Sequence, residues 1–132
     1  MESFTIRYNE EEGIIEARVY CQFDWNLIEE LAPKLGEMVL EKDCDLIFLD
    51  FTNSEIIMPT LRIYKTPEKL GLEFSKAGVN AWSLRRALLI KPGQKDFNFL
   101  EDVSVNSAQT VRLFTDEGDA KSWLKTPVSE KL

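Results

Sequence analysis

One segment constrains the fold of this chain more than any other, the run DLIFLDFT at residues 45–52. Residues 46–49 are all apolar, and an aspartate stands at each end of them. A strand that is apolar on both faces must be covered on both faces, which is typical of the sheet of an α/β protein. Ligands and partners of such sheets lie beyond the carboxyl ends of the strands. Asp50 and the residues that follow it, Thr52, Asn53 and Ser54, are therefore candidate binding residues.

Hydrophobic periodicity predicts alternating strands and helices along the rest of the chain. Strands are expected at residues 4–8, 14–20, 45–51, 86–90 and 111–114. Helices are expected to follow Asp24, Pro59, Thr66, Asp96 and Asp116. The acidic connection at 9–13 is short, so the first two strands should pair antiparallel. Right-handed crossovers then predict an α/β fold, a mixed sheet of about five strands with about four helices packed on it.

Local signals mark the ends of several of these helices. Asp24 is expected to cap the first helix and Asp96 the helix that follows it, and residues 115–117 form a capping start for the last helix. Thr66 is expected to cap a helix that has Pro67 at its first position. Pro33 falls inside the apolar stripe of the first helix, so either this helix kinks there or its regular part begins near Pro33.

The length and charge of the chain limit its organisation and its partners. Its 132 residues fit one domain, 1–132, with residues 126–132 expected as a flexible tail. The formal net charge of -7 argues against nucleic acid or an anionic membrane as the main partner. The only adjacent basic pair, Arg85 and Arg86, precedes an expected strand, and we interpret it as a solvated strand start.

Several kinds of chemistry are excluded or disfavoured by residue types. Histidine is absent, which excludes Ser-His-Asp and Cys-His catalysis and histidine-bearing zinc sites. No Gly-rich phosphate loop follows any expected strand, and we expect neither a cofactor nor a metal. Cys21 and Cys44 form no C-x-x-C pattern and are expected to be buried structural thiols.

Two negative signals bear on localisation. Residues 1–12 are too polar for a signal peptide. No apolar stretch approaches the roughly 20 residues that span a bilayer. We therefore expect a cytoplasmic protein with reduced thiols and without stable membrane insertion.

The order of elements and three passages resemble the STAS-like and SpoIIAA-like family of small α/β domains, which includes anti-sigma factor antagonists. The passages are residues 20–24, which lead into the first helix, residues 46–52 with the following loop, and residues 111–124. The last passage, VRLFTDEGDAKSWL, is similar to the closing strand and helix of the SpoIIAA relatives. The resemblance implies a small α/β domain with a regulatory role that depends on partner binding.

This sequence departs from the antagonists at their phosphorylation site. Antagonists carry Asp-Ser-Ser-Gly after the central strand, and a serine of this stretch is phosphorylated. With Asp50 at the strand-end aspartate of that pattern, residues 58–60 stand in its place, and Pro59 has no hydroxyl. Thr60, one position further, and Ser54, earlier in the loop, are the candidate phosphorylation sites. A phosphate at Thr60 would be stabilised beside a helix start.

Our leading hypothesis is a non-enzymatic regulatory or interaction domain that binds a protein partner or forms a homodimer. Its surface would be the loop at 52–60 and the helix that follows. Five residues would supply apolar contacts there: Ile56, Ile57, Met58, Leu61 and Tyr64. The alternative is that these side chains fold back into the core.

The sequence is compatible with two further functions. A carrier of a small molecule or lipid could use eight Phe and three Trp to line an apolar pocket, although aromatic side chains usually fill a core. An enzyme could use a carboxylate and hydroxyls at the strand end, from Asp50, Thr52, Asn53, Ser54 and Glu55, but a lone aspartate there more often closes a turn. We expect no catalytic residues.

Overall fold

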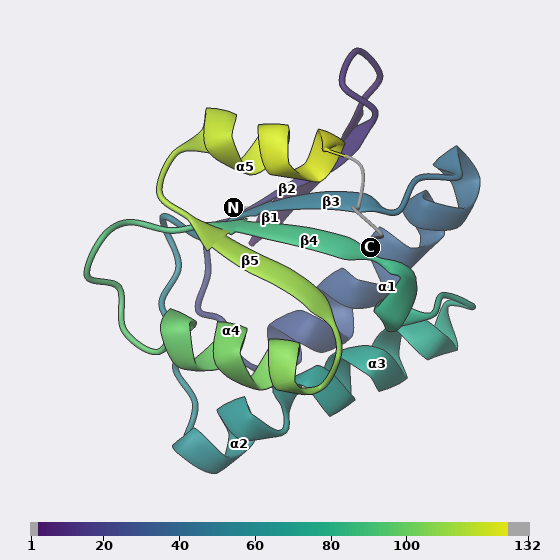
Figure 1. The fold of residues 1–132 in the computed structure, drawn as a ribbon. Coiled ribbons are helices and arrows are strands. Elements are labelled where there is room, and N and C mark those ends of the chain that lie inside the picture. The colour runs from purple at the N-terminus through teal and green to yellow at the C-terminus, as the bar shows by residue number, and fades with distance from the viewer. Residues whose placement is uncertain (1–2, 127–132) are drawn as a thin grey trace, which may run out of the picture.

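Five strands form one mixed sheet in the computed structural model, which describes residues 3–126 (Figure 1). They are β1 (Phe4–Asn9), β2 (Ile14–Val19), β3 (Leu46–Asp50), β4 (Arg85–Leu89) and β5 (Thr110–Phe114). Their order in the sheet is β1-β2-β3-β4-β5. β1 and β2 pair antiparallel, and the other neighbours pair parallel. The predicted α/β fold with a mixed sheet of about five strands is confirmed.

Helices cover both faces of this sheet (Figure 1). They are α1 (Trp25–Lys42), α2 (Thr60–Tyr64), α3 (Thr66–Lys76), α4 (Phe97–Asn106) and α5 (Glu117–Lys125), with a short 3-10 helix η1 (Ala81–Ser83). The parallel connections all step in one direction across the sheet, so right-handed crossovers place α1 to α4 on the same face. α5 follows the last strand and covers the opposite face.

Strand alternation divides the core into two layers. On β2, Ile15, Ala17 and Val19 face α1, whereas Ile14 packs with Phe48 and Leu124 beneath α5. On the α1 side, three phenylalanines meet near the carboxyl ends of the strands, Phe23, Phe51 and Phe97. Their ring centroids lie 5.0 to 6.2 Å apart. These aromatic side chains therefore fill the core.

Two of the four expected helix caps make a side-chain capping hydrogen bond, and Asp96, which precedes α4, makes none. The Asp24 carboxylate accepts a hydrogen bond from the Leu27 amide at 2.9 Å, and Asp116 accepts one from Asp119 at 2.9 Å. The predicted Thr66 cap is wrong, because Thr66 is already helical and its hydroxyl donates to the Arg62 carbonyl oxygen at 2.8 Å. The backbone of α2 thus leads almost directly into α3.

α1 runs from Trp25 to Lys42 with Pro33 inside it. The alternative in which the regular helix begins near Pro33 is therefore wrong. Both cysteines are free, Cys44 buried and Cys21 partly buried. Of the predicted tail, only Thr126 belongs to the described residues. No helix within residues 3–126 has the length and apolarity needed to cross a membrane.

The interpretation of Arg85 and Arg86 as a solvated strand start is wrong for Arg86. Arg86 lies beside Ile47 and Val111 in the sheet, and its side chain enters the layer beneath the helices, 3% exposed. Arg85 faces the other way, and its guanidinium donates to the Trp123 and Thr126 carbonyl oxygens at 2.7 and 2.6 Å. Successive side chains of a strand point to opposite faces, so the two arginines have opposite environments.

Candidate functional site

Asp50 closes the turn that follows β3. Its Oδ1 accepts hydrogen bonds from the Thr52 amide at 2.9 Å and the Thr52 hydroxyl at 2.7 Å. Its Oδ2 lies 2.7 Å from Arg18 Nη1. Burial acts to raise the pKa of Asp50, but the hydrogen bonds from Thr52 and Arg18 outweigh it and lower the pKa. Asp50 and Thr52 are thus engaged with each other and with β2.

The Ser54 side chain also makes its hydrogen bond within the fold. Its buried hydroxyl donates to the Cys21 carbonyl oxygen at 2.7 Å. The Gln94 amide donates to the carbonyl oxygens of Phe51 and Ser54 at 3.0 and 2.7 Å, which ties the loop after β4 to the loop after β3. Of the three polar residues after the strand, only Asn53 is exposed, whereas Thr52 is half-buried and Ser54 is buried.

The five apolar residues around α2 divide into two groups. Ile56 is buried and Met58 packs against the core, as the alternative interpretation expected. The other three side chains are 49%, 65% and 63% exposed: Ile57, Leu61 and Tyr64. We call these three residues the α2 patch. Between them, Thr60 is exposed at the first position of α2, while Ile63 on the same helix is buried.

Two surface hollows flank the α2 patch. One, of about 530 Å³, lies beside Ile57 between the loops after β3 and β4 and reaches from Glu55 to Phe97. The other, of about 310 Å³, lies beside Tyr64 and is lined also by Lys65, Glu68 and the end of α4. The patch therefore stands between two depressions whose linings include charged side chains.

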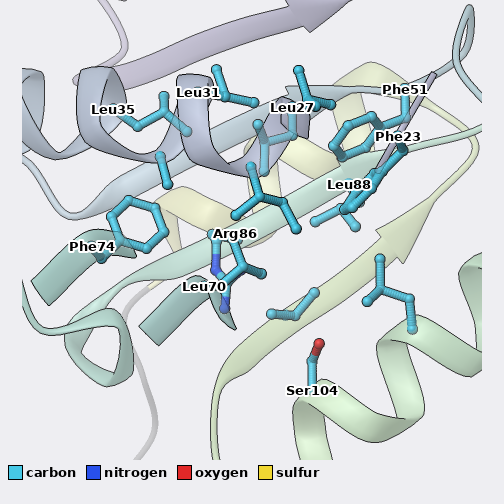
Figure 2. Close-up of a pocket in the computed structure, with 15 residues that line it drawn as sticks. Phe23, Leu27, Leu31, Leu35, Phe51, Leu70, Phe74, Arg86, Leu88 and Ser104 are labelled. Carbon is cyan, nitrogen blue, oxygen red and sulfur yellow. The ribbon is translucent and has the colours of Figure 1, made fainter. Parts of the chain in front are cut away.

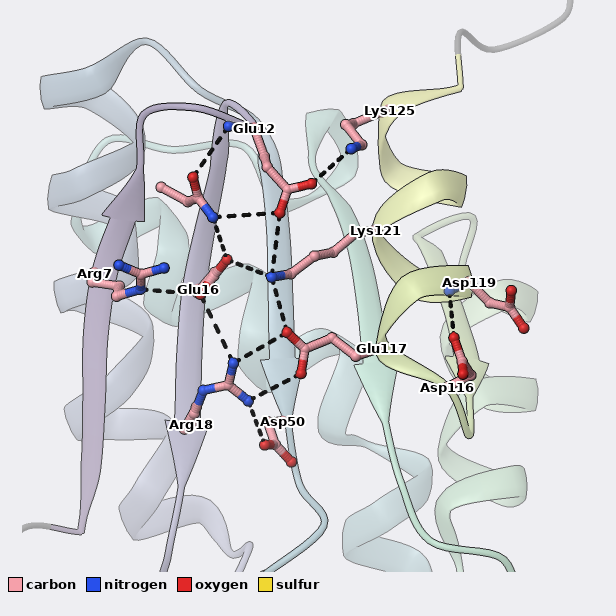
Figure 3. Close-up of polar contacts among 11 residues, drawn as sticks. Arg7, Glu12, Glu16, Arg18, Asp50, Asp116, Glu117, Asp119, Lys121 and Lys125 are labelled. Atoms are coloured by element: carbon pink, nitrogen blue, oxygen red, sulfur yellow. Dashed lines mark hydrogen bonds and ion pairs between the residues drawn. The ribbon is translucent and has the colours of Figure 1, made fainter.

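A charged network on the opposite face of the sheet was not predicted (Figure 3). The Glu16 carboxylate lies 2.8 Å from Lys121 Nζ and 3.1 Å from Arg7 Nε. Lys121 also lies 2.9 Å from Glu117, which in turn lies 3.3 Å from Arg18. Glu16 and Arg18 alternate with the apolar residues of β2, and this alternation was the signal in the sequence. It identifies a polar face but not the helix that covers it.

The pKa shifts in this network stabilise the charged forms. Burial acts to raise the pKa of Glu16, but hydrogen bonds from Lys121, Asn9 and Arg7 lower it to about 2. Burial acts to lower the pKa of Lys121, and its hydrogen bonds to Glu16 and Glu117 raise it overall. A general acid or base works best with a pKa near the working pH. These groups instead keep fixed charges near neutral pH and hold α5 on the sheet.

An internal cavity of about 40 Å³ lies between the sheet and helices α1, α3 and α4 (Figure 2). This volume corresponds to about three water-sized spheres. Pockets that hold drug-sized ligands measure roughly 300 to 1,000 Å³. The lipid-carrier alternative therefore stays a prediction that requires the cavity to widen.

Metal coordination and similarity to known proteins add no further assignment. Within residues 3–126, no group of three or more acidic or cysteine side chains is placed to hold a metal ion. No protein-family model matches the sequence, and a search of curated proteins finds no significant match. The interpretation of the site therefore rests on its geometry.

Proposed function

We propose that this chain is a non-enzymatic regulatory domain of the STAS-like type that binds a protein partner through the α2 patch. Binding of a second copy of the chain through the same patch is a variant of the proposal. The observation that carries it is the exposure of Ile57, Leu61 and Tyr64 within eight consecutive residues.

The clustering of these side chains distinguishes them from ordinary surface residues. The other strongly exposed large apolar side chains of the described residues are Tyr20, Leu40, Leu72, Trp82 and Val105. Each stands on a different element or loop, and isolated apolar residues are normal on a protein surface. Val105 on α4 and Leu72 on α3 stand on the two helices that α2 contacts. A clustered apolar patch with a polar surround is typical of an interaction site.

The two hollows support the same assignment. A protein interface needs both projecting side chains and depressions that receive the partner's side chains. Leu61 and Tyr64 project from α2, and tyrosine is enriched at interfaces because its ring is large and its hydroxyl tolerates water. Lys65 and Glu68 at one hollow and Lys91 and Lys95 at the other provide a charged rim.

The proposal includes no catalysis because the polar side chains at the strand end are already engaged in contacts within the fold. Asp50 is hydrogen-bonded to Thr52 and paired with Arg18, and its pKa is lowered by these contacts. Ser54 is buried with its proton donated to a carbonyl oxygen. Neither side chain is presented to a substrate at this edge of the sheet.

The proposal is tested by substituting the patch and a matched residue elsewhere. Leu61→Asp and Tyr64→Asp introduce a charge into the patch, whereas Leu72→Asp introduces the same charge on α3, at a side chain that is 54% exposed. Self-association is measured by sedimentation equilibrium, and partner binding by affinity purification from the native source with each variant. Loss of an interaction in both patch variants, with retention in Leu72→Asp, is expected. An interaction that survives both patch substitutions would refute the proposed surface.

A further inference from the structure

Arg86 is a buried guanidinium without a carboxylate partner. Its side chain is enclosed beneath the helices, and no ion pair within residues 3–126 includes it. Its Nη2 donates to Gln109 Oε1, and its buried Nε donates to no atom. Buried charges are normally paired, so an arginine in this state needs an explanation.

Arg86 lines the internal cavity described above. Among the fifteen lining residues only Arg86 and Ser104 are polar, and the other walls are leucine, phenylalanine and similar side chains. Figure 2 shows the Ser104 hydroxyl pointing from α4 into the space that Arg86 enters from β4. Any polar ligand of the cavity would therefore have to bind at these two residues.

The orientation of Arg86 is fixed from outside the cavity. Gln109 accepts a hydrogen bond from Arg86 with its Oε1 and donates one from its Nε2 to the Pro67 carbonyl oxygen at 2.8 Å. Gln109 is itself buried. Held in this way between α3 and the start of β5, the amide keeps the guanidinium in place and leaves Nε free.

Arg86 remains charged near neutral pH. Burial lowers its pKa to about 10, which is still well above the physiological range. A cation fixed in an apolar chamber is unfavourable unless an anion shares the site. Arginine pairs with carboxylates in particular, because its planar fork offers two parallel N–H donors.

We propose that the cavity binds a small carboxylate anion, with the carboxylate on Arg86 and Ser104 and a short apolar end against the leucine and phenylalanine walls. The volume of about three water-sized spheres selects an acid of a few carbon atoms, such as acetate. Chloride would satisfy the charge but would leave the apolar end of the chamber unused. This site is independent of the α2 patch and of the function proposed for it.

The test is an NMR titration of the whole chain with sodium acetate and, separately, with sodium chloride at equal ionic strength. We expect the Arg86 Nε–H resonance and the amides of Leu100 and Val111 to shift saturably with acetate, and at much higher concentration or not at all with chloride. Absence of a saturable shift would refute the site. An equal response to both salts would refute the carboxylate assignment.

Two neighbouring arginines provide a matched pair of variants. Arg86→Met removes the charge from the cavity, and Arg85→Met makes the same change one residue earlier on the opposite face. The acetate-dependent amide shifts should be lost in Arg86→Met and kept in Arg85→Met. If Arg86→Met does not fold, Ser104→Ala is used instead and should weaken acetate binding several-fold. Unchanged acetate affinity in the folded variant would contradict the proposal.

Discussion

Lys121 Nζ on α5 lies 2.8 Å from Glu16 Oε2 on β2, and the Glu16 side chain is only 2% exposed. The last helix is thus held to the sheet by a buried ion pair in addition to the apolar contacts of Ala120 and Leu124. Because Arg7 and Asn9 also donate to Glu16, its carboxylate is the centre of the network in Figure 3.

Removing this carboxylate should destabilise the fold. Glu16→Ala leaves Lys121 beside Glu117 but without its buried partner, and we expect a loss of about 3 kcal/mol in the free energy of unfolding. Urea denaturation at neutral pH measures this. Glu11→Ala, at the exposed tip of the hairpin, is the control and should change stability by less than about 0.5 kcal/mol. Equal midpoints for the two variants would show that the Glu16 pair contributes nothing.

The lowered pKa of Glu16 predicts how the stability of the fold depends on pH. The pKa of Glu16 is about 2 in the folded chain and 4.5 as the ordinary value, so below pH 4.5 the unfolded chain binds a proton that the folded chain does not. Stability from this group is therefore full above 4.5 and is lost as the pH falls towards 2. The difference amounts to about 3 kcal/mol.

Denaturation measured at several pH values checks this contribution. Glu16→Gln cannot titrate, so its stability should decline less steeply than that of the natural chain over the same range. Other carboxylates with lowered pKa values, Glu117 and Asp50 among them, produce the decline that remains. Parallel curves for the two proteins would contradict the assignment.

The fold was predictable because its signals are local. The apolar run at 46–49 and the caps Asp24 and Asp116 each depend on residues within one or two turns, and the structure confirms them. The side-chain contacts of the strand-end residues, in contrast, depend on partners that are distant in the sequence. Ser54 donates to the carbonyl oxygen of Cys21, and Asp50 pairs with Arg18, both more than thirty positions away. Nothing in the spacing of these residues indicates such contacts.

The burial of Arg86 likewise could not be predicted from its neighbours in the sequence. Two adjacent arginines before an apolar stretch are typical of a solvated strand start, and Arg85 is indeed partly exposed. Whether the second arginine is buried depends on which face of β4 the helices cover, and this is set by crossover connections rather than by neighbouring residues. Gln109, its hydrogen-bond partner, lies 23 positions further along the chain.

Close packing of α1 against α3 depends on Gly36. A Cβ at this position would lie 2.7 Å from the Ala77 Cβ, which is attached directly to the backbone and cannot move alone. Overpacking typically costs about 1–3 kcal/mol. This outweighs the gain of up to about 1 kcal/mol in helix propensity for alanine over glycine. We therefore expect Gly36→Ala to lower the free energy of unfolding by about 1 kcal/mol.

Thermal or urea denaturation measures the effect of Gly36→Ala, with Leu40→Ala as the control on the same helix. Leu40 is exposed, so its truncation should change stability by less than about 0.5 kcal/mol. A Gly36→Ala protein as stable as the natural chain would mean that α1 and α3 can separate slightly without loss of packing.

A negative charge at Thr60 should weaken any interaction made by the α2 patch. Thr60 is exposed, starts α2 and directly precedes Leu61, so a charge there enters the patch without disturbing the core. Thr60→Glu imitates part of the charge of a phosphate. A charged carboxylate that loses water in an apolar interface without a partner costs more than the roughly 1–3 kcal/mol that a neutral polar group costs. A loss of about 1.4 kcal/mol corresponds to a tenfold weaker association.

The matched control for this charge is Ser75→Glu, at an exposed position of α3 outside the patch. Sedimentation equilibrium, or titration with a partner identified by affinity purification, compares the two variants with the natural chain. Weaker association in Thr60→Glu together with unchanged association in Ser75→Glu is expected, with both variants equally stable in urea. If both variants associate as the natural chain does, then Thr60 lies outside the contact surface, and a phosphate there could not act by direct repulsion of the partner.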